Sequence, residues 1–376
     1  MRKKILFILN SLAMGGAEKQ TITLVNSLDK NIFETGLVYL DNENSLLPQV
    51  DASRLTVLEC LYRKHRLDLR VVKKLRQLIH SHRYDAVVCV DSYPMLYAFI
   101  CRLTGRQRPA IVQVLHFTTH RPDAWIRIKN IYLYRHLMNR CKKTIFVCKS
   151  QMEYWVKKFS IQPAVSTYIY NGIDTAYFSD TFSAEEKLRL RQSLGFHAND
   201  FVVGICAALR PEKKHTDFID AIKLARTQNP DIKGLVVGDG PLKKNIQRHI
   251  HANRMGGSVK MAGFQHDVRP YIAVCDCMAL TSHEVETFSM AALEAMAMAR
   301  PMVMTDLGGA REQVEHGVSG FIYAKGDVTT LAGHLYNMAK NQSHGVMGAN
   351  ARTRVCNNFT LGKMVEAYTG LLKEIK

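Results

Sequence analysis

One strand–loop–helix unit in the sequence decides the fold, and it occupies residues 277–297: Cys277-Met-Ala-Leu-Thr-Ser-His-Glu-Val-Glu-Thr-Phe-Ser-Met-Ala-Ala-Leu-Glu-Ala-Met-Ala297. The apolar run Cys277–Leu280 predicts a buried strand, and the polar residues after it predict a loop. Ser289 is a favourable N-cap, and the small and apolar residues behind it predict a helix over Ser289–Met298. Units of this kind, repeated along a chain, form a parallel sheet covered by helices on both faces.

The same alternation of apolar runs and helical segments continues along the whole chain, which predicts an α/β fold. Helices are predicted between the strands, among them Ala124–Cys141 and Ala310–His316. Turn residues at Asn171-Gly-Ile-Asp174 mark a boundary between residues 1–172 and 173–360. We therefore expect two doubly wound, Rossmann-like domains that face each other across a cleft. The predicted strands are Lys4–Leu9, Thr35–Leu40, Leu55–Leu58, Ala86–Val90, Ala110–Leu115, Thr144–Val147, Ser166–Tyr170, Phe201–Cys206, Lys233–Val237, Val259–Met261, Cys277–Leu280, Met302–Thr305 and Gly320–Ile322.

The length and composition fit two globular domains. The chain has 376 residues, of which 47% are hydrophobic, a fraction ordinary for folded proteins and too high for a disordered one. No apolar run reaches the ~18 residues that span a membrane, and the short run Ile5–Leu9 predicts a first strand instead of a signal peptide. The nine cysteines show no paired spacing. We expect buried thiols in a reducing compartment, and neither disulfides nor zinc.

The positive charge is concentrated in the first half of the chain. The net charge is +18, from 51 Lys and Arg against 33 Asp and Glu. Residues 1–172 carry 27 basic and 12 acidic residues, or +15, whereas residues 173–376 carry 24 and 21, or +3. Basic and aromatic residues are interleaved at helical spacing over Trp125–Arg140. This pattern leaves three interpretations open: binding to an anionic membrane surface, binding to nucleic acid, or a solvated helix face.

Two loops that follow predicted strands carry residues suited to a phosphate. Gly15 and Gly16 lie between the first strand and a helix, where glycines let a ligand approach the backbone and the helix N-terminus favours an anion. Arg210 and Lys213 follow Phe201–Cys206 and supply cations at the end of that strand. The glycine pair does not form the G-x-G-x-x-G pattern of dinucleotide-binding proteins, so we expect no nicotinamide cofactor.

Two glutamates belong to the segment quoted above. Glu286 precedes the helix and can project from the loop towards a ligand. Glu294 lies in a helix that is apolar nearly all round, where an unpartnered carboxylate would be costly. We expect Glu294 to bind the hydroxyls of a ribose, while the first N–H groups behind Ser289 bind a diphosphate. The sequence has no Asp-x-Asp loop and no histidine cluster, so no metal site is expected.

Five motifs match one protein family in their order and their distances. The chain resembles the retaining glycosyltransferases of family 4, which have the GT-B fold and use nucleotide-diphospho-sugars, and the resemblance covers essentially the whole chain. It implies that residues 1–172 form the acceptor-side domain, that 173–360 bind the nucleotide-sugar, and that a final helix over 361–376 returns to the first domain. The motifs are Gly15-Gly-Ala-Glu18, Asn171-Gly-Ile-Asp174, Arg210-Pro-Glu-Lys213, Gly238-Asp-Gly-Pro241 and the pair Glu286 and Glu294.

The resemblance implies a role for each matching residue of the second half. Glu294 corresponds to the family's ribose-binding glutamate, and Glu286 to the glutamate that contacts the donor sugar near the reacting centre. The backbone N–H groups of Ser289 and Met290 correspond to those that hold the distal phosphate. Lys213 matches the family lysine on the diphosphate.

Other matching positions extend this implied site. Gly16, with Gly15 beside it, matches the glycine of the first domain that closes over the phosphates. His116 matches a histidine that many members place beside the donor sugar and the acceptor. The loop at Gly263 and Phe264 resembles the one that stacks against the nucleobase.

The sequence departs from the family pattern at two positions. Members usually carry an arginine five residues before the lysine, where this chain has Ala208, and we expect Arg210 to supply the missing guanidinium. Thr287 stands where glycine is common after the first glutamate. This second departure leaves the identity of the donor sugar open.

The sequence therefore predicts a hexosyltransferase-type glycosyltransferase. We expect it to move a sugar from a nucleotide-diphospho-sugar, UDP-linked, to a hydroxyl of a lipid-linked or envelope polysaccharide acceptor such as lipopolysaccharide, with retention and without metal or other cofactor. The predicted catalytic residues are Glu286, His116, Lys213 and Arg210. The enzyme is expected in the cytoplasm, at the inner face of the cell membrane, where its basic first half meets anionic lipid, and without a nucleic-acid partner.

Three alternatives stay open at this point. The first is a sugar-nucleotide 2-epimerase of the same architecture, which would need no acceptor. The second is a nucleic-acid-binding protein that uses the basic half, although this leaves Glu286, Ser289 and Glu294 unexplained. The third is a non-catalytic partner subunit that binds sugar nucleotides, against which the intact glutamate pair argues.

Overall fold

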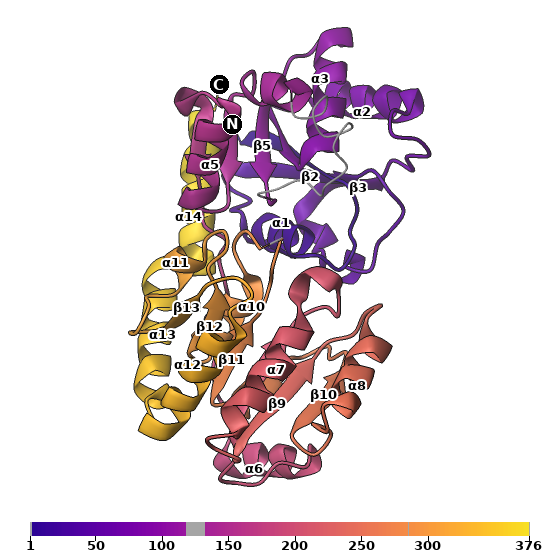
Figure 1. Ribbon diagram of the computed structural model, residues 1–376. Coiled ribbons are helices and arrows are strands. Elements are labelled where there is room, and N and C mark those ends of the chain that lie inside the picture. Colours follow the sequence, from indigo (N-terminus) through magenta and orange to yellow (C-terminus); the bar gives the residue numbers. More distant parts are fainter. Residues whose placement is uncertain (1, 118–131, 285, 376) are drawn as a thin grey trace. The chain divides into compact units, whose positions relative to one another are not determined.

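The chain forms two compact α/β units in the computed structural model, which describes residues 2–117, 132–284 and 286–375 (Figure 1). Unit 1 consists of Met1–Gly172 together with Leu361–Lys376, and unit 2 consists of Ile173–Thr360. Each unit is built around one sheet whose strands are all parallel. The predicted fold class, two doubly wound Rossmann-like sheets, is thereby confirmed.

Unit 1 contains a seven-stranded sheet in the order β3-β2-β1-β4-β5-β6-β7. The order reverses direction between β1 and β4, which makes that pair the switch point of the sheet. Its strands are β1 (Lys3–Leu9), β2 (Phe33–Tyr39), β3 (Leu55–Cys60), β4 (Ala86–Val90), β5 (Ala110–Leu115), β6 (Lys143–Phe146) and β7 (Ser166–Tyr168). Its helices are α1 (Gly16–Ser27), α2 (Leu69–His82), α3 (Ser92–Thr104), α5 (Lys149–Phe159) and α14 (Leu361–Glu374), with 3-10 turns η1 (Leu47–Gln49), η2 (Ala52–Arg54) and η3 (Pro163–Val165).

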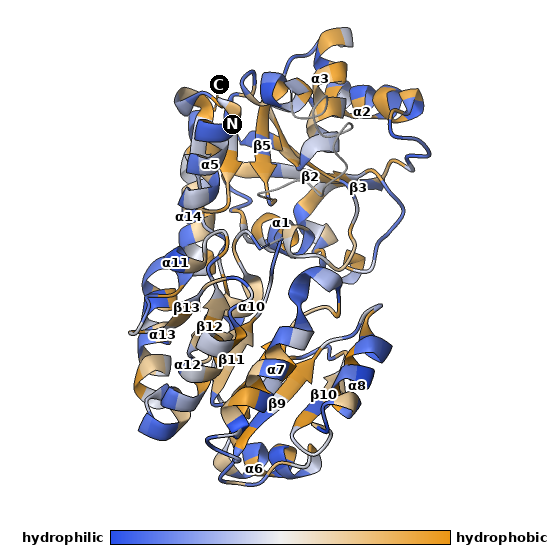
Figure 2. Cartoon of the chain, in the orientation of Figure 1, coloured by the Kyte–Doolittle hydropathy of each residue, from blue (hydrophilic) through white to orange (hydrophobic). Residues whose placement is uncertain are grey.

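The two faces of the unit 1 sheet bury separate clusters of side chains. Because strand residues alternate between faces, Phe7 of β1 packs on one side with α1 and α14, and Ile8 packs on the other with α2, α3 and α5. Helix α14 contributes Tyr368 and Leu372 to the first cluster, although the whole of unit 2 separates it from β7 in the sequence. In Figure 2 the strands are largely orange, while blue marks the outer sides of the helices, as expected for a sheet covered on both faces.

Unit 2 contains a six-stranded sheet in the order β10-β9-β8-β11-β12-β13, with its switch point between β8 and β11. Its strands are β8 (Phe201–Cys206), β9 (Ile232–Val237), β10 (Val259–Gly263), β11 (Cys277–Leu280), β12 (Met302–Thr305) and β13 (Gly320–Tyr323). Its helices are α6 (Ala184–Ser193), α7 (His215–Arg226), α8 (Lys243–Ala252), α9 (Arg269–Ala273), α10 (Met290–Ala297), α11 (Ala310–Gln313), α12 (Val328–Asn341) and α13 (His344–Asn358), with the 3-10 turn η4 (Pro211–Lys213).

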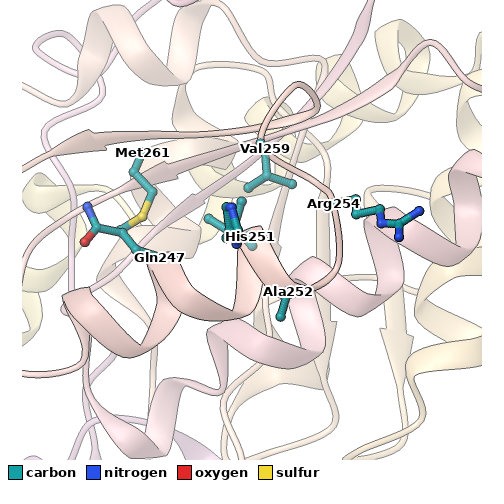
Figure 3. A pocket seen from close by; sticks show the side chains of 8 residues that line it. Gln247, His251, Ala252, Arg254, Val259 and Met261 are labelled. Carbon is teal, nitrogen blue, oxygen red and sulfur yellow. The ribbon is translucent and has the colours of Figure 1, made fainter.

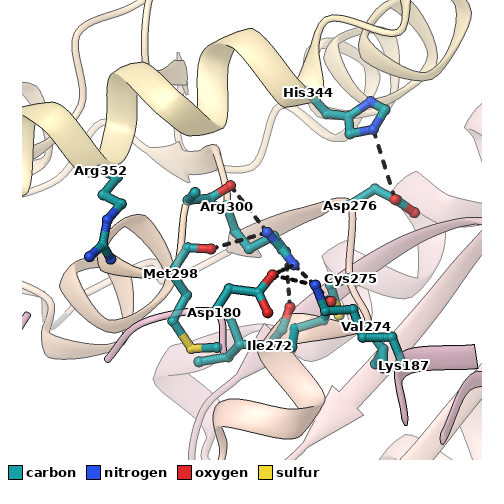
Figure 4. Close-up of polar contacts among 12 residues, drawn as sticks. Asp180, Lys187, Ile272, Val274, Cys275, Asp276, Met298, Arg300, His344 and Arg352 are labelled. Carbon is teal, nitrogen blue, oxygen red and sulfur yellow. Dashed lines mark hydrogen bonds and ion pairs between the residues drawn. The ribbon is translucent and has the colours of Figure 1, made fainter. Parts of the chain in front are cut away.

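A charged network at the amino end of the unit 2 strands ties helix α6 to the sheet (Figure 4). Arg300, which precedes β12, donates to the carbonyl oxygens of Ile272 at 3.2 Å and Met298 at 3.0 Å and pairs with Asp180 at 2.7 Å. Lys187 of α6 reaches the same carboxylate at 2.7 Å. Burial alone would raise the pKa of Asp180, but the hydrogen bonds from Lys187 and Arg300 lower it below its ordinary value. The charged groups at this end of unit 2 are therefore paired with one another and stabilise the packing of α6 on the sheet.

Most predicted elements agree with the structure, and two helices differ. The predicted helix Ala310–His316 ends at Gln313, because the chain turns into extended backbone at Val314. Helix α13 is missing from the prediction, because its sequence mixes glycines with polar residues and shows a weak apolar stripe. The predicted helix Ala124–Cys141 begins outside the described residues, and within them the chain is helical over 132–138.

Two further properties of the described chain bear on the prediction. Among the described residues, no helix has the length and apolar character needed to cross a membrane. All nine cysteines are free thiols, and eight of them are buried.

Candidate active site

The predicted donor-binding residues lie on loops at the carboxyl ends of the unit 2 strands. Glu286 and Ser289 lie between β11 and α10, and Lys213 lies in η4 between β8 and α7. Strands β8 and β11 are neighbours at the switch point of the sheet. Loops at a switch point diverge to opposite faces and leave room for a ligand, so this is where a doubly wound sheet binds one.

Lys213 and Glu286 form an ion pair. Lys213 Nζ lies 2.6 Å from Glu286 Oε2, and their side chains are 21% and 12% exposed. The Ser282 hydroxyl donates to the same carboxylate oxygen at 2.9 Å. The Thr281 hydroxyl donates at 2.8 Å to the Lys213 carbonyl oxygen, which fastens η4 to the start of the β11–α10 loop. The structure thus brings two of the four predicted catalytic residues into contact.

A second pair holds the same two loops together. His283 Nε2 lies 2.6 Å from Asp217 Oδ2, and the His283 backbone N–H donates at 2.9 Å to the Glu212 carbonyl oxygen. Asp217 lies in the first turn of α7, so this helix, η4 and the β11–α10 loop are joined by hydrogen bonds. His283 is not among the site residues predicted from the sequence. Its position three residues before Glu286, on a loop after a buried strand, is the signal that could have identified it.

Helix α10 presents its N-terminus at this site. Ser289 is its N-cap, and the Ser289 hydroxyl accepts the N–H of Ala292 at 3.3 Å, as predicted for a capped helix. Glu294 lies in the second turn and is 9% exposed, so its carboxylate is held in a largely apolar helix. The buried thiol of Cys206 at the end of β8 has its pKa raised by burial, by Cys275 and by the Glu294 carboxylate, an interaction that links Glu294 to β8.

The backbone of the β11–α10 loop is shaped by the segment before α11. Gly309 donates its N–H to the Thr287 carbonyl oxygen at 2.7 Å. Gly308 has φ +57°, and a Cβ there would lie 2.2 Å from the Glu286 carbonyl oxygen, so this position requires glycine. The Ser289 N–H donates to Gln313 Oε1 at 3.0 Å. In this structure that N–H is therefore engaged within the protein, whereas the N–H of Met290, the other predicted phosphate donor, has no hydrogen bond to any described residue.

Arg210 lies on a loop whose position is set by backbone packing and not by the Arg210 side chain. The Arg210 side chain is exposed and has no hydrogen bond or ion pair with the described residues, and Ala208 is exposed too. The loop after β9 packs against this segment, because a Cβ on Gly238, at φ +142°, would lie 2.1 Å from the Ala207 carbonyl oxygen. The glycine of the predicted Gly238-Asp-Gly-Pro241 motif thus serves close contact between two loops. The replacement of the missing arginine by Arg210 stays a prediction.

Phe264 follows β10 and presents an accessible ring. It is 49% exposed, and its ring packs edge-on against His266 with centroids 4.9 Å apart. The Gly263 carbonyl oxygen before it accepts the Gly238 N–H at 2.8 Å, which anchors the loop. An exposed aromatic ring on an anchored loop suits stacking on a planar base.

The predicted residues of unit 1 lie on the loops after β1 and β5, at the carboxyl ends of the strands near the switch point between β1 and β4. Gly15 is the N-cap of α1, and a Cβ on Gly16 would meet no atom within 4 Å. His116 follows β5, and its backbone N–H donates to Asp91 Oδ1 at 3.3 Å. Asp91 follows β4 at φ +67°, and its carboxylate does not cap α3, although aspartate is a favoured N-cap. A strained backbone that turns a carboxylate away from its usual partner is typical of functional positions.

Burial, not charge, governs the ionisable groups of this switch point. Burial lowers the pKa of His116 to about 4, so its imidazole is neutral at neutral pH. Burial also raises the pKa of Asp91 to about 7, an effect opposed by the His116 N–H and increased by the Glu18 carboxylate. The pKa of Glu18 is raised as well, chiefly by burial. Neither carboxylate is among the site residues predicted from the sequence.

Two protein families match this chain, one in each half of the sequence. Residues 14–177 match the family described as Glycosyltransferase Family 4, and residues 186–354 match the one described as Glycosyl transferases group 1. The chain belongs to glycosyltransferase family 4. The two matches are consecutive and leave only short segments of the chain unmatched, so the resemblance stated from the motifs is confirmed.

Solved structures agree with this assignment. The glycosyltransferase is similar to Anabaena HepE in complex with UDP, with a TM-score of 0.86 and 26% identity over 98% of this chain and 99% of that chain. A glycosyltransferase from Rickettsia africae has a TM-score of 0.84 at 16% identity, covering 100% of this chain and 99% of that chain, and shows the shared fold. The fold is GT-B, as the sequence predicts.

Characterised relatives of the glycosyltransferase are sugar transferases. It is 23% identical, over 80% of this chain and 78% of the relative, to the Escherichia coli UDP-Gal:alpha-D-GlcNAc-diphosphoundecaprenol alpha-1,3-galactosyltransferase. It is 25% identical, over 83% of each chain, to a Campylobacter jejuni enzyme that transfers N-acetylgalactosamine to N-acetylgalactosamine-N,N'-diacetylbacillosaminyl-diphospho-undecaprenol. The predicted enzyme class, transfer of a sugar, is confirmed.

A hollow in unit 2 lies apart from the donor-binding loops. A hollow of about 760 Å³ lies between α8 and the edge strand β10, lined by Gln247, His251 and Met261 among others (Figure 3). It extends to Val259, at the amino end of β10, whereas the donor loops follow the carboxyl ends of the strands. Within the described ranges, no three His, Cys, Asp or Glu side chains are grouped to hold a metal ion.

Proposed function

We propose that this glycosyltransferase moves a hexose from a UDP-linked donor to a hydroxyl of a lipid-linked or envelope polysaccharide acceptor, with retention and without a metal ion. The observation that carries the donor assignment is the similarity to HepE, whose solved complexes contain UDP, UDP with glucose, and UDP-glucose. The relatives from Escherichia coli and Campylobacter jejuni, named for diphosphoundecaprenol-linked acceptors, support the acceptor class.

We propose that unit 2 binds the donor through the loops after β8 and β11. The departing diphosphate gains negative charge as the bond to the sugar breaks. Lys213, Arg210 and the N-terminus of α10 supply positive charge and N–H donors, and each such preorganised donor contributes about 3–4 kcal/mol. Glu294 binds the ribose, and Phe264 stacks on the base. These groups make a divalent cation unnecessary, because the protein itself supplies the positive charge.

Glu286 changes partner when the donor binds. Its carboxylate accepts from Lys213 and Ser282 in this structure. A diphosphate attracts the Lys213 ammonium, which frees the carboxylate oxygen for the donor sugar hydroxyls near the reacting carbon. The Ser282 hydroxyl keeps the carboxylate in place during this exchange, since it reaches the same oxygen at 2.9 Å.

His116 contacts the acceptor hydroxyl or the donor sugar as a neutral imidazole. Its low pKa means that it donates or accepts a hydrogen bond without carrying charge at neutral pH. The acceptor hydroxyl attacks from the leaving-group face, and the departing phosphate takes up its proton, which gives retention.

The basic unit 1 is proposed to meet an anionic membrane surface at the cytoplasmic face. Helix α2 presents Lys73, Lys74 and Arg76 to solvent and contains no acidic residue. Unit 1 also exposes Leu69 at the start of α2 and Leu103 at the end of α3, which are 80% and 81% accessible. Exposed leucines combined with lysine and arginine are typical of peripheral membrane binding.

A panel of nucleotide-sugars tests the donor and the reaction type together. Purified protein is incubated with each UDP-, GDP-, ADP- and dTDP-sugar, with and without a diphosphoundecaprenol-linked acceptor, and released nucleotide and product are measured. We expect turnover with a UDP-sugar that rises with acceptor and persists in EDTA, and NMR of the product to show the anomeric configuration of the donor. Conversion of the donor without acceptor into its C2 epimer would replace this proposal with the epimerase.

Co-sedimentation with liposomes tests the membrane proposal. Vesicles with phosphatidylglycerol should bind the protein, neutral phosphatidylcholine vesicles should not, and salt should weaken the binding. The double variant Lys73→Glu/Arg76→Glu in unit 1 should lose binding, while Lys244→Glu on α8 of unit 2 serves as the matched control. Equal binding to both kinds of vesicle, or binding by the double variant, contradicts the proposal.

A further inference from the structure

Gln313, at the end of α11, pairs with the backbone of the residue that caps α10. Its side-chain Oε1 accepts the Ser289 N–H at 3.0 Å, and its Nε2 donates to the Ser289 carbonyl oxygen at 2.8 Å. The side chain is 0% exposed, so both hydrogen bonds are fully shielded from water. Two such bonds from one amide fix both the position and the rotation of the Ser289 peptide groups.

Gln313 is itself held from behind. Its backbone N–H donates to the Gly309 carbonyl oxygen at 3.0 Å, and its carbonyl oxygen accepts from Arg354 Nε at 2.8 Å. Arg354, on α13, also donates to the Glu312 carbonyl oxygen at 2.9 Å. The glutamine therefore belongs to a rigid connection that runs from α13 through α11 to the start of α10.

This connection decides which N–H groups of α10 are left for a ligand. The Ser289 N–H is taken by Gln313, and the Ala292 N–H is taken by the Ser289 hydroxyl. The N–H groups of Met290 and Ala291 begin the helix, so they have no acceptor within it, and neither has a hydrogen bond within the described chain. They lie at the positive end of a helix dipole, where an anion is favoured.

We propose that Gln313 is the positioning residue of the diphosphate site: it holds Ser289 so that the Met290 and Ala291 N–H groups receive the distal phosphate, and the Ser289 N–H does not. This inference rests on the proposed function, because it names the protein groups that meet the donor's diphosphate. It replaces one of the phosphate contacts that the family resemblance implies.

The choice of residue type at position 313 follows from the two bonds. A glutamate accepts the Ser289 N–H but cannot donate to the carbonyl oxygen, and it adds a negative charge behind the anion site. A methionine of similar length makes neither bond: it leaves the buried Ser289 N–H without a partner, and the Ser289 carbonyl oxygen with only the Leu293 N–H at 3.3 Å. Only a neutral amide satisfies both groups without opposing an anion.

Calorimetric binding of UDP, UMP and uridine to Gln313→Glu and Gln313→Met tests the proposal. We expect Gln313→Glu to weaken UDP binding by about tenfold or more, with a smaller loss for UMP and a change within about twofold for uridine. The loss should shrink at high salt. Gln313→Met should weaken UDP less, without that salt dependence. Gln247→Glu, exposed on α8 of the same unit, adds the same charge and should change nothing.

The possible outcomes distinguish the positioning role of Gln313 from the proposed donor. Equal loss for UDP, UMP and uridine, or no loss in either variant, overturns the positioning role while UDP binding by the unaltered protein leaves the proposed function standing. Failure of the unaltered protein to bind UDP contradicts the proposed donor instead. Thermal unfolding is measured for both variants. A variant whose Tm stays within about 5 °C of that of the unaltered protein is used to test the positioning role. If neither variant is stable enough, Gln313→Asn replaces them.

Discussion

The switch point of unit 1 lies between β1 and β4, that of unit 2 lies between β8 and β11, and the loops at these two places differ in charge and hydrogen bonding. Unit 2 joins charged side chains directly, with Lys213 paired to Glu286 and His283 to Asp217. Unit 1 gathers Glu18, Asp91 and His116 with a single backbone hydrogen bond among the latter two, and burial pushes each group towards its neutral form.

This difference shows how one topology supports two electrostatic tasks. An anionic diphosphate needs cations and N–H donors that are already oriented, and the unit 2 loops are cross-linked in that way. A sugar hydroxyl needs hydrogen-bond partners that do not attract counter-ions, and neutral groups in a desolvated site provide them. Both solutions occupy the same position on a doubly wound sheet, where loops diverge after neighbouring strands.

The largest expected effect comes from removing the cation of unit 2. Lys213→Ala should lower turnover about 10²–10³-fold, because the diphosphate loses a preorganised donor as its charge grows. Stability should change little, since Lys213 is partly exposed and the Glu286 carboxylate keeps its hydrogen bond from Ser282 when the ion pair is lost. Steady-state kinetics and thermal unfolding measure the two effects, with the exposed Lys244→Ala as control. Parallel loss of activity and stability would show that the lysine is structural and would break the comparison.

The next effect concerns nucleotide affinity in unit 2. Glu294→Ala should weaken UDP binding by about 10–100-fold in calorimetry, because a charged hydrogen bond to the ribose hydroxyls is worth about 1.5–3 kcal/mol. Glu294→Gln keeps the side-chain volume in this buried helix and should lose somewhat less. The exposed Glu315→Ala provides the control. Unchanged affinity in both Glu294 variants would remove the ribose from this residue.

A smaller effect is expected from unit 1, and it should fall on turnover alone. His116→Ala should lower kcat about 10–100-fold, as for a lost hydrogen-bonding partner in the reaction, while the Kd for UDP stays within about twofold. NMR titration of the ring should show a neutral imidazole from pH 8 down to about pH 5, because burial lowers its pKa to about 4. A ring that titrates near pH 6.5 would mean that the unit 1 switch point is not desolvated.

The smallest effect is on stability and tests the neutral character of unit 1 directly. The pKa of Asp91 is raised to about 7, so the stabilisation relative to an ionised side chain is complete at low pH and is lost as the pH rises through 7. Asp91→Asn keeps the shape of the side chain and the oxygen that accepts the His116 N–H. Between pH 5 and 8.5 the unfolding free energy of this variant should rise by about 1–2 kcal/mol relative to that of the unaltered protein. A full shift of the Asp91 pKa would contribute ~1.4 kcal/mol for each pKa unit. The expected total is smaller than that sum because the residue is partly exposed.

Chemical denaturation at a series of pH values measures this difference. Asp231→Asn, at an exposed position of unit 2, gives the matched control. A constant difference between the Asp91 variant and the unaltered protein over this range would show that Asp91 is ionised throughout.

The fold and much of unit 2's site follow from local patterns in the sequence. Short apolar runs gave strands such as Phe201–Cys206 and Cys277–Leu280 with the bounds that the structure has, because buried parallel strands are uniformly apolar. Ser289 was recognisable as an N-cap from the small residues after it. These features depend on neighbours in the sequence, so no tertiary information is needed to predict them.

Other features depend on contacts between distant segments and were not predictable in this way. The pair of Gln313 with Ser289 joins residues 24 apart, and the bond between His116 and Asp91 joins residues 25 apart. Helix α13 has a weak apolar stripe, so its helicity depends on packing against α10. The raised pKa of Asp91 arises from burial by the folded unit, which the position of the residue at the end of a strand does not indicate.

Helix α14 has a consequence for the order in which the polypeptide acquires its structure during translation. Residues 173–360 leave the ribosome as one continuous unit, whereas unit 1 lacks Met364, Tyr368 and Leu372 of its core until all of that unit has been synthesised. Until then helix α1 packs on this face of the unit 1 sheet, and the part that α14 covers stays exposed. Shortening the carboxyl end of this protein should damage the half that is made first.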